Sequence, residues 1–226
     1  MFIGHFAPAF AARAVSSDAP RLGTLFVAAQ LVDWAFFLLA ILGIEHYRIE
    51  PGFTVMKPFF FYDYPWTHSL LGSFVWATLF GLVVGRVTRS SLAGIIGACV
   101  VLSHWVLDFV SHGPDLTLGG GPDRFGLGLW DHPILAMGIE LAITLGAFWI
   151  YVRRTRGPVV PPLLLLAALL IFQAVDWFAP APAEVTPMQS FAALIAFGIL
   201  TLLAAFVGNT RWHKRETGLA VATTPR

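Results

Sequence analysis

The chain has 226 residues, of which 57% are hydrophobic and 12% are charged. Its mean hydropathy is +0.75, and its formal net charge is only +1. In soluble domains about a quarter of the residues are charged, so this composition excludes an ordinary soluble domain and indicates an integral membrane protein.

Six apolar segments of membrane-spanning length follow one another along the chain. A hydrocarbon core about 30 Å thick requires about 20 apolar residues in a helix. By this criterion the spans lie at about 22–44, 66–87, 91–111, 133–152, 160–178 and 190–208. The sequence therefore predicts an all-α, polytopic membrane helix bundle with about six transmembrane helices. Residues 1–210 form one integral-membrane domain in this interpretation, and residues 211–226 form a disordered cytoplasmic tail.

The positions of the basic residues predict the orientation of the chain. If the N-terminus is inside, the outer loops contain only Arg48, Lys57 and Arg124 of the 14 lysines and arginines, and all the others lie in inner segments. Because positively charged loops remain in the cytoplasm, we expect a multi-pass protein of the cell (inner or plasma) membrane with both termini cytoplasmic.

Two long outer loops separate the first four spans. The loop at about 45–65 contains the aromatic run "KPFFFYDYPWTHS", which predicts a belt of rings at the level of the lipid headgroups. The loop at about 112–132 contains "LGGGPDRFGLGLWDH", whose glycines favour a connection made of turns.

The third span carries ligand-type side chains in the stretch "VVLSHWVLDFVSHGPDL". His104, Asp108 and His112 are four residues apart, and four helical residues advance by about 400°, so the three side chains follow one stripe of the helix. Imidazole and carboxylate are donors that zinc and related divalent ions use in proteins.

Further ionisable residues lie within the other predicted spans. Asp33 is near the middle of the first span, His68 is at the start of the second, and Glu140 is in the fourth, after Asp131 at its outer end. Burial in a membrane costs about 2.5–3.5 kcal/mol for such a residue on insertion scales, which makes each of them a functional candidate. Together with the stripe on the third span they predict a buried metal site. The alternative is a metal-free polar network that specifies helix packing. His213, in the predicted tail, is expected to be solvated.

Four short motifs in this order resemble the YdjM-like family of predicted membrane-bound, metal-dependent hydrolases. They are "IGHF" at 3–6, "LVDW" at 31–34, "THS" at 67–69 and "SHWVLD" at 103–108, and the likeness covers about residues 1–131. The family is distantly similar, in the order of its ligands, to zinc-dependent phospholipases C and related single-strand nucleases. The resemblance implies metal ligation by His5, Asp33, His68, His104 and Asp108, with His112 as a sixth ligand.

His5 is a candidate through this resemblance alone, since a residue so close to the terminus is otherwise expected to be solvated. The orientation predicted from the charges places the N-terminus inside, whereas His68 and His112 lie toward the outside. A re-entrant N-terminal segment within the bundle reconciles the two, because irregular backbone at membrane depth is tolerated where protein surrounds it.

The leading functional hypothesis is a metal-dependent hydrolase that acts near the outer half of the membrane. It holds one or two divalent ions, zinc in first place and manganese as the alternative, and the metal activates a bound water. Glu140 or Asp131 orients or deprotonates that water. The expected partners are membrane lipids, with a lipid or another phosphoester as substrate and no nucleic acid.

Two other functions stay open at this point. One is a transporter for metal ions or protons that uses the intramembrane His/Asp site. The other is a scaffold in which the polar residues only hold helices together. The sequence leaves the oligomeric state open.

Overall fold

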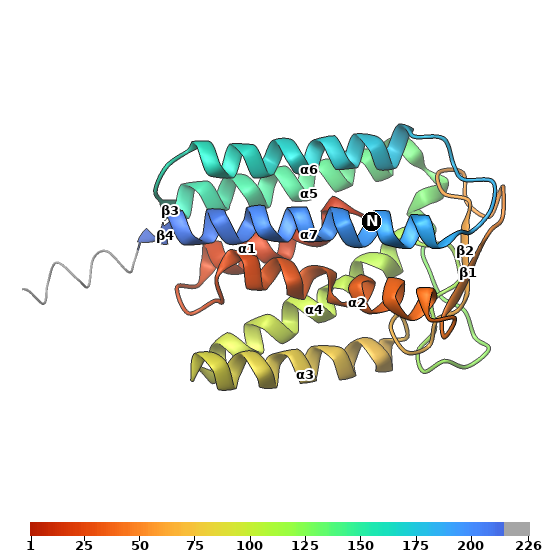
Figure 1. The fold of residues 1–226 in the computed structure, drawn as a ribbon, viewed down its shortest axis with the longest axis horizontal. Coiled ribbons are helices and arrows are strands. Elements are labelled where there is room, and N and C mark those ends of the chain that lie inside the picture. Colours follow the sequence, from red (N-terminus) through yellow and green to blue (C-terminus); the bar gives the residue numbers. More distant parts are fainter. Residues whose placement is uncertain (215–226) are drawn as a thin grey trace, which may run out of the picture.

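Six long apolar helices form a bundle in the computed structural model, which describes residues 1–214 (Figure 1). The six are long and apolar enough to cross a membrane, and they are α2 (Leu22–Ile41), α3 (Leu70–Thr88), α4 (Ser91–Ser111), α5 (Pro133–Arg154), α6 (Val160–Phe178) and α7 (Pro187–Thr210). The predicted all-α polytopic bundle is therefore confirmed. The largest differences in boundary are at the second span, which begins at Leu70, at the first, which ends at Ile41, and at the sixth, which begins at Pro187.

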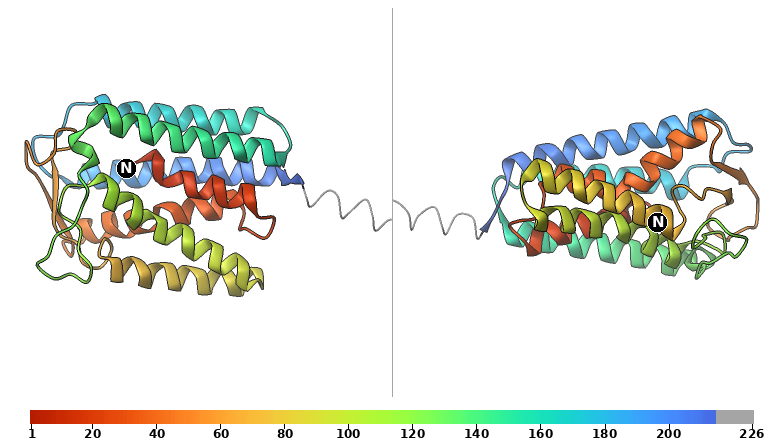
Figure 2. Two further views of the ribbon diagram at one scale, coloured as in Figure 1. Left: turned by 180° about the vertical axis from the view of Figure 1, so that it is seen from behind. Right: turned by 90° about the horizontal axis from the view of Figure 1, so that it is seen from below.

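The N-terminal segment lies inside the bundle. It consists of a 3₁₀ turn, η1 (Ile3–Phe6), and a short helix, α1 (Ala7–Val15), which is too short to cross a membrane. Ile3, Phe6 and Phe10 are each 0% exposed, and the N-terminus lies among the long helices in both views of Figure 2. The expected insertion of this segment into the bundle is confirmed.

Side chains of α5 and α6 accept the hydrogen bonds of the inserted backbone. Glu140 Oε1 accepts from the amides of Phe2, at 2.5 Å, and Gly4, at 3.1 Å. Gln173 Oε1 accepts from the amide of Ile3 at 3.0 Å. A backbone group without a partner at membrane depth costs several kcal/mol, so these acceptors are what allow a non-helical segment in the bundle.

Aromatic rings fix α1 against its neighbours. Phe6 stacks on Phe26 of α2 with 4.4 Å between ring centroids. Phe10 meets Phe26 edge-on at 5.3 Å, Phe148 of α5 edge-on at 5.5 Å and Tyr151 of α5 at 5.6 Å. Offset and edge-on pairs of this kind are favoured by the ring quadrupoles, and they form the apolar core on this side of the bundle.

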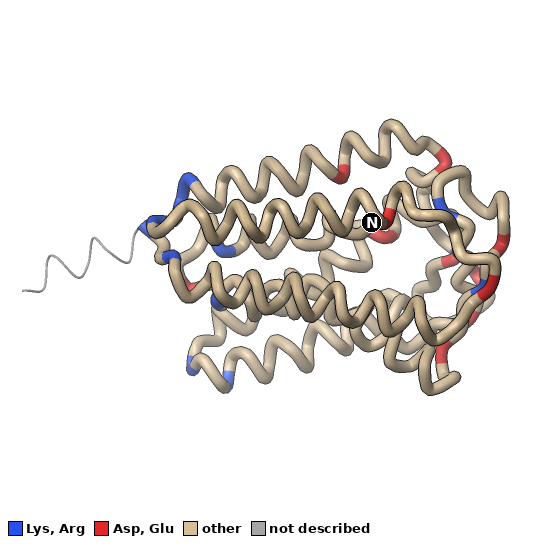
Figure 3. The backbone as a smooth tube through the Cα atoms, turned by 45° about the horizontal axis from the view of Figure 1, so that its top comes forward, with Lys and Arg blue, Asp and Glu red and all other residues tan. Residues whose placement is uncertain are grey.

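One end of the bundle is basic and the other is acidic (Figure 3). Helices α3, α5 and α7 end, and α4 and α6 begin, at the basic end, where most lysines and arginines gather. The acidic residues gather mainly in the loops at the opposite end. This segregation agrees with the charge pattern from which cytoplasmic termini are predicted.

At the basic end the ordered structure continues beyond the predicted boundary at residue 210. A short strand, β4 (Trp212–His213), pairs with β3 (Thr155–Arg156). Arg211 is 4% exposed and donates to Thr155 Oγ1 at 3.0 Å, and His213 is also 4% exposed, with Nε2 3.1 Å from the Ala14 carbonyl. The tail predicted for 211–226 therefore begins too early, and His213 is buried instead of solvated. Residues 215–226 of that prediction lie outside the described residues.

The aromatic loop at the acidic end is only partly the belt that its composition predicts. It forms an antiparallel hairpin of β1 (His46–Ile49) and β2 (Phe59–Asp63). Tyr62 and Trp66 are 38% and 64% exposed, as expected of a belt. Phe61 and Tyr64 instead turn inward and stack on each other at 5.3 Å, beside the ring of His68.

We predict that Glu140→Ala destabilises the protein and releases the N-terminal segment. The substitution leaves the Phe2 and Gly4 amides without an acceptor, and an unsatisfied buried hydrogen-bonding group costs about 1–3 kcal/mol. The measurement is the thermal unfolding midpoint in detergent, together with proteolytic cleavage of the N-terminal segment. Glu140→Gln keeps the acceptor oxygen and is expected to retain most of the stability.

Thr144→Val serves as the matched control. Thr144 lies one turn further along α5, is 0% exposed, and its hydroxyl has no hydrogen-bond partner in the described structure. If Thr144→Val destabilises the protein as much as Glu140→Ala does, the hydrogen bonds of Glu140 are not what holds the segment.

Candidate metal centre

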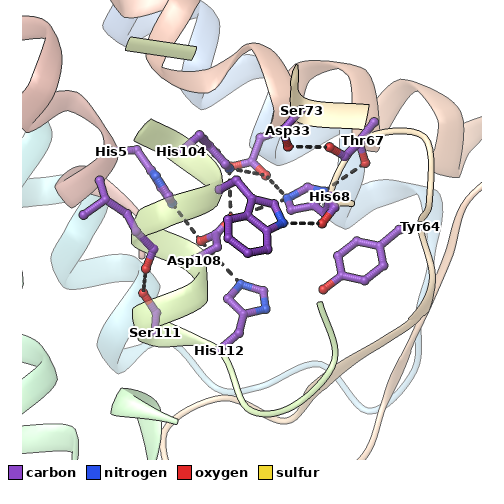
Figure 4. Close-up of polar contacts among 12 residues, drawn as sticks. His5, Asp33, Tyr64, Thr67, His68, Ser73, His104, Asp108, Ser111 and His112 are labelled. Carbon is purple, nitrogen blue, oxygen red and sulfur yellow. Dashed lines mark hydrogen bonds and ion pairs between the residues drawn. The ribbon is translucent and has the colours of Figure 1, made fainter. Parts of the chain in front are cut away.

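The centre is built on the C-terminal half of α4. His104 and Asp108 are 1% and 2% exposed, and His112, at the C-terminal end of the helix, is 4% exposed. The Nε2 atom of His104 is 3.1 Å from Asp108 Oδ2, and that of His112 is 3.5 Å from Asp108 Oδ1 (Figure 4). The predicted stripe is thus present, with Asp108 between the two histidines.

Asp33 of α2 and His68 reach the same point from neighbouring elements. Asp33 Oδ1 is 3.2 Å from Nε2 of His68 and 3.5 Å from Nε2 of His104. The predicted span 66–87 places His68 inside the second helix, but α3 begins only at Leu70, so His68 lies before it. Ser69 caps that helix by accepting from the Gly72 amide at 2.9 Å, which leaves His68 in the preceding turn, 3.6 Å from Asp108 Oδ2.

His5 enters the centre from η1. Its Nε2 atom is 3.0 Å from Asp108 Oδ1, and its ring stacks on that of His104 with 3.8 Å between centroids. With 1% exposure, it is buried rather than solvated. The amino nitrogen of Met1 is also 3.2 Å from Asp108 Oδ1. The six residues expected as ligands therefore converge, and they do so around the carboxylate of Asp108.

Two groups of three residues have the spacing of metal ligands. In each group the ligand atoms all lie within 4.8 Å of one another; one group is His5, His104 and Asp108, and the other is Asp33, His68 and His104. The two groups share His104. The carboxylate of Asp108 extends one oxygen toward His5 and His112 and the other toward His68 and His104.

The hydrogen bond of His104 fixes which of its nitrogens faces the carboxylates. Nδ1 is 2.8 Å from the carbonyl oxygen of Ala29, which can only accept, so Nδ1 carries the proton. In the neutral ring Nε2 then presents a lone pair toward Asp33 and Asp108. This buried nitrogen makes no hydrogen bond in the described structure.

His68 and His112 are oriented in the same way by acceptors outside the centre. Nδ1 of His68 is 2.9 Å from Thr67 Oγ1, whose hydrogen goes to Glu45 Oε2 at 2.6 Å. Nδ1 of His112 is 3.1 Å from Asp115 Oδ1. Such outer hydrogen bonds are typical of metal-binding histidines, because they set the tautomer and the ring orientation.

Asp115 is itself held by Tyr64, whose hydroxyl donates to Asp115 Oδ1 at 3.1 Å. Burial and the nearby Asp115 carboxylate raise the pKa of the Tyr64 hydroxyl well above its usual value, so Tyr64 keeps the proton that it donates.

The glycine-rich loop supports His112 by close backbone contact. The Gly128 amide donates to the His112 carbonyl at 2.7 Å. A Cβ atom at Gly126 would lie 2.1 Å from the Gly113 oxygen and 2.6 Å from the His112 oxygen, so only glycine fits there. The loop is more than a simple connection, because it fixes the end of α4 that carries His112.

This donor set fits a divalent cation. In their neutral forms, three histidines present Nε2 lone pairs toward two carboxylates, and lone pairs and carboxylate oxygens repel one another. A cation between them removes the repulsion and offsets the cost of burying the charges. The mixture of imidazole nitrogen and carboxylate oxygen suits zinc or manganese.

Glu45 and Asp115 were not among the residues singled out from the sequence. They are 1% and 0% exposed, and each lies behind a histidine of the centre. Asp115 follows His112 by three residues, a spacing that could have drawn attention to it. Glu45 is 22 residues from Thr67, and no sequence pattern links the two.

The structure places the two expected catalytic carboxylates differently. Glu140 is 3% exposed and lines the cavity next to the centre, and its hydrogen bonds to Phe2 and Gly4 both use Oε1. Asp131 is exposed in the turn η2 (Leu129–Asp131), away from the lining of this cavity, and accepts from the Val55 amide at 3.1 Å.

A cavity of about 400 Å³ opens beside the cluster. Asp33, His68, Asp108 and His112 belong to its wall, whereas His5 and His104 do not line it. Its volume is within the range of small-molecule sites, so the cluster has room for water and a substrate.

No family model, curated protein or solved structure matches this chain. The YdjM-like resemblance therefore depends on the four motifs, and the centre has to be interpreted from its own geometry.

We predict that the purified protein binds a divalent metal and that His104→Ala combined with Asp108→Asn abolishes this binding. The variant removes a nitrogen shared by both ligand groups and one of the two central carboxylates. Metal content is measured by mass spectrometry after incubation with zinc or manganese. His46→Ala is the control, because His46 is 42% exposed and pairs with Asp63 far from the centre. A folded wild-type protein that takes up neither ion would contradict the assignment.

We further predict that Thr67→Val weakens metal binding by about 10–100-fold, the usual effect of losing an outer hydrogen bond to a ligand. Valine keeps the shape but provides no acceptor for Nδ1 of His68. Affinity is measured by competition with a chelator. Thr67→Ser should bind normally, and so should Thr78→Val, which removes an exposed hydroxyl from α3. Equal affinities in Thr67→Val and the wild type would exclude this role of Thr67.

Proposed function

We propose that this protein is a membrane-embedded, metal-dependent hydrolase that cleaves a phosphoester or lipid substrate. The observation that carries the proposal is the orientation of His68, His104 and His112. Each has its Nδ1 bound outside the centre, so each directs Nε2 toward the carboxylates. Part of this cluster lines a cavity, which distinguishes it from a closed, purely structural site.

The residues that would hold the metal are His5, Asp33, His68, His104, Asp108 and His112. The two-sided arrangement around Asp108 suits one or two ions, with zinc favoured and manganese as the alternative. A bound ion supplies Lewis-acid activation of water and of the phosphoryl oxygen. His68, His104 and His112 keep fixed tautomers throughout, and Asp33, at 20% side-chain exposure, is more accessible than Asp108, at 3%.

Glu140 is the better of the two candidate bases. Its backbone hydrogen bonds use Oε1, and no hydrogen bond to Oε2 is found among the described residues, so Oε2 could accept a proton from a water in the cavity. Asp131 would have to act from outside the cavity lining, which makes it the weaker candidate.

The apolar core argues against the alternative of a metal or proton transporter. Phe6, Phe10, Leu22, Phe26 and Val101 are each 0% exposed and fill the interior between the cluster and the basic end. A relay needs polar groups distributed through the depth of the membrane. Here the ionisable ligands are concentrated at one level of the bundle.

We predict that the metal-loaded protein hydrolyses a phosphodiester and that Asp33→Asn lowers kcat/KM by more than ~100-fold, because it removes a ligand rather than an outer partner. The assay follows release of p-nitrophenol from bis(p-nitrophenyl) phosphate, with and without a chelator. Asp63→Asn is the matched control, since Asp63 is 52% exposed in the hairpin.

Two outcomes would contradict the hydrolase. One is a wild-type protein that contains metal but hydrolyses neither this ester nor a panel of lipid phosphoesters. The other is an Asp33→Asn variant that is as active as the wild type, which would assign the turnover to a contaminant. Metal uptake into proteoliposomes, measured in parallel, would support the transporter instead.

A further inference from the structure

We infer that the substrate is a membrane lipid with a phosphate-ester headgroup, whose hydrocarbon chain lies in a groove between α6 and α7. This inference rests on the proposed hydrolase function and names the substrate class for the same site. The observation behind it is the uneven lining of the cavity, which is polar on one wall and apolar elsewhere.

The polar wall is the metal centre, and most of the remaining lining is aromatic or aliphatic. On α6 and α7 this lining consists of Phe172, Val175, Trp177, Ala192, Ala193, Ala196 and Phe197. The three alanines are small and lie on adjacent turns of α7, so they leave space beside the helix. A polar, water-soluble substrate would gain nothing from such a surface, whereas a hydrocarbon chain is accommodated by it.

The groove reaches the surface of the bundle at residues of α6 and α7. Val175 is 56% exposed although it also lines the cavity, and Ala192 is exposed as well. Both residues belong to helices long and apolar enough to cross a membrane. The outer surface at this point therefore faces lipid if the helices span the bilayer, and a lipid chain could move into the groove without leaving the hydrocarbon region.

An ion pair and an indole nitrogen without a partner among the described residues complete the lining of the cavity. Lys57, only 9% exposed, places Nζ 2.8 Å from Asp176 Oδ1 and 2.7 Å from the Asp176 carbonyl. The indole nitrogen of Trp177 is buried and has no hydrogen-bond partner among the described residues. Lys57, Asp176 and Trp177 all line the cavity.

The reaction this implies is hydrolysis of one phosphate ester bond. The oxygen of water bonds to phosphorus, and the bond from phosphorus to one ester oxygen breaks. One proton of the water ends on the departing alcohol, and the other stays on the new phosphate or passes to solvent. No redox partner or second substrate is required.

Photo-crosslinking tests the groove independently of catalysis. The purified protein is mixed with phosphatidic acid that carries a diazirine at the end of one acyl chain, irradiated and digested, and crosslinked peptides are identified by mass spectrometry. We expect crosslinks in the C-terminal part of α6 and the N-terminal part of α7, which contain the groove residues. Ala196→Trp and Ala192→Trp, which fill the groove, should reduce them at least ~10-fold, whereas Leu202→Trp, 72% exposed on the same helix, should not.

Hydrolysis assays then separate this inference from the proposed function. A groove-filling variant should lose turnover of the long-chain lipid phosphoester but keep that of bis(p-nitrophenyl) phosphate. If neither Ala192→Trp nor Ala196→Trp reduces the crosslinks, the acyl chain does not bind in the groove. The same conclusion follows if the folded variants hydrolyse both substrates normally, and in that case the proposed hydrolase function still stands. If crosslinking follows the groove but nothing is hydrolysed, lipid binding is supported and the hydrolase is overturned.

Discussion

The burial of the Asp108 carboxylate is the constraint around which the bundle is organised. A negative charge at this depth has to be compensated, since its transfer from water to an apolar environment is very unfavourable. Four histidines surround the carboxylate, namely His5 from η1, His68 from the turn before α3, and His104 and His112 from α4, and a cation held among them would supply the compensation. Elements far apart in the sequence must therefore pack closely. The second buried carboxylate, Asp33, adds negative charge to the centre and so strengthens the attraction for a cation.

A second layer of interactions keeps this centre rigid. The Ala29 carbonyl, the Thr67 hydroxyl and the Asp115 carboxylate each orient one histidine, and Glu45 and Tyr64 orient two of these acceptors in turn. The hairpin and the glycine-rich loop, which look like plain connections, exist in part to position this layer. Such support is what distinguishes a site held ready for a ligand from a cluster of polar residues that happen to meet.

The elements that could be predicted from the sequence are those with a local signal. Hydropathy located the six long helices, and the four-residue spacing located His104, Asp108 and His112 on one face. His5 was accessible only through the resemblance, because nothing in its neighbourhood indicates burial. The roles of Glu45 and Tyr64 could not be predicted, because they depend on contacts with Thr67 and Asp115, which are distant in the sequence. The aromatic run around Tyr64 is equally compatible with an interfacial belt. The start of the tail was misplaced because Arg211 and His213 are polar residues whose partners lie on distant segments.

The inserted N-terminal segment also sets an order of events during biosynthesis. The amide of Ile3 binds Gln173, which is 170 residues further along the chain. At about 5–20 residues per second, roughly 10–30 s separate the synthesis of the two partners. Throughout that interval the Ile3 amide lacks this acceptor, although His104, on which His5 stacks, is made before Gln173. The six expected ligands all lie between residues 5 and 112, so the ligand set is made before Glu140 and Gln173, the acceptors that hold its N-terminal member in place.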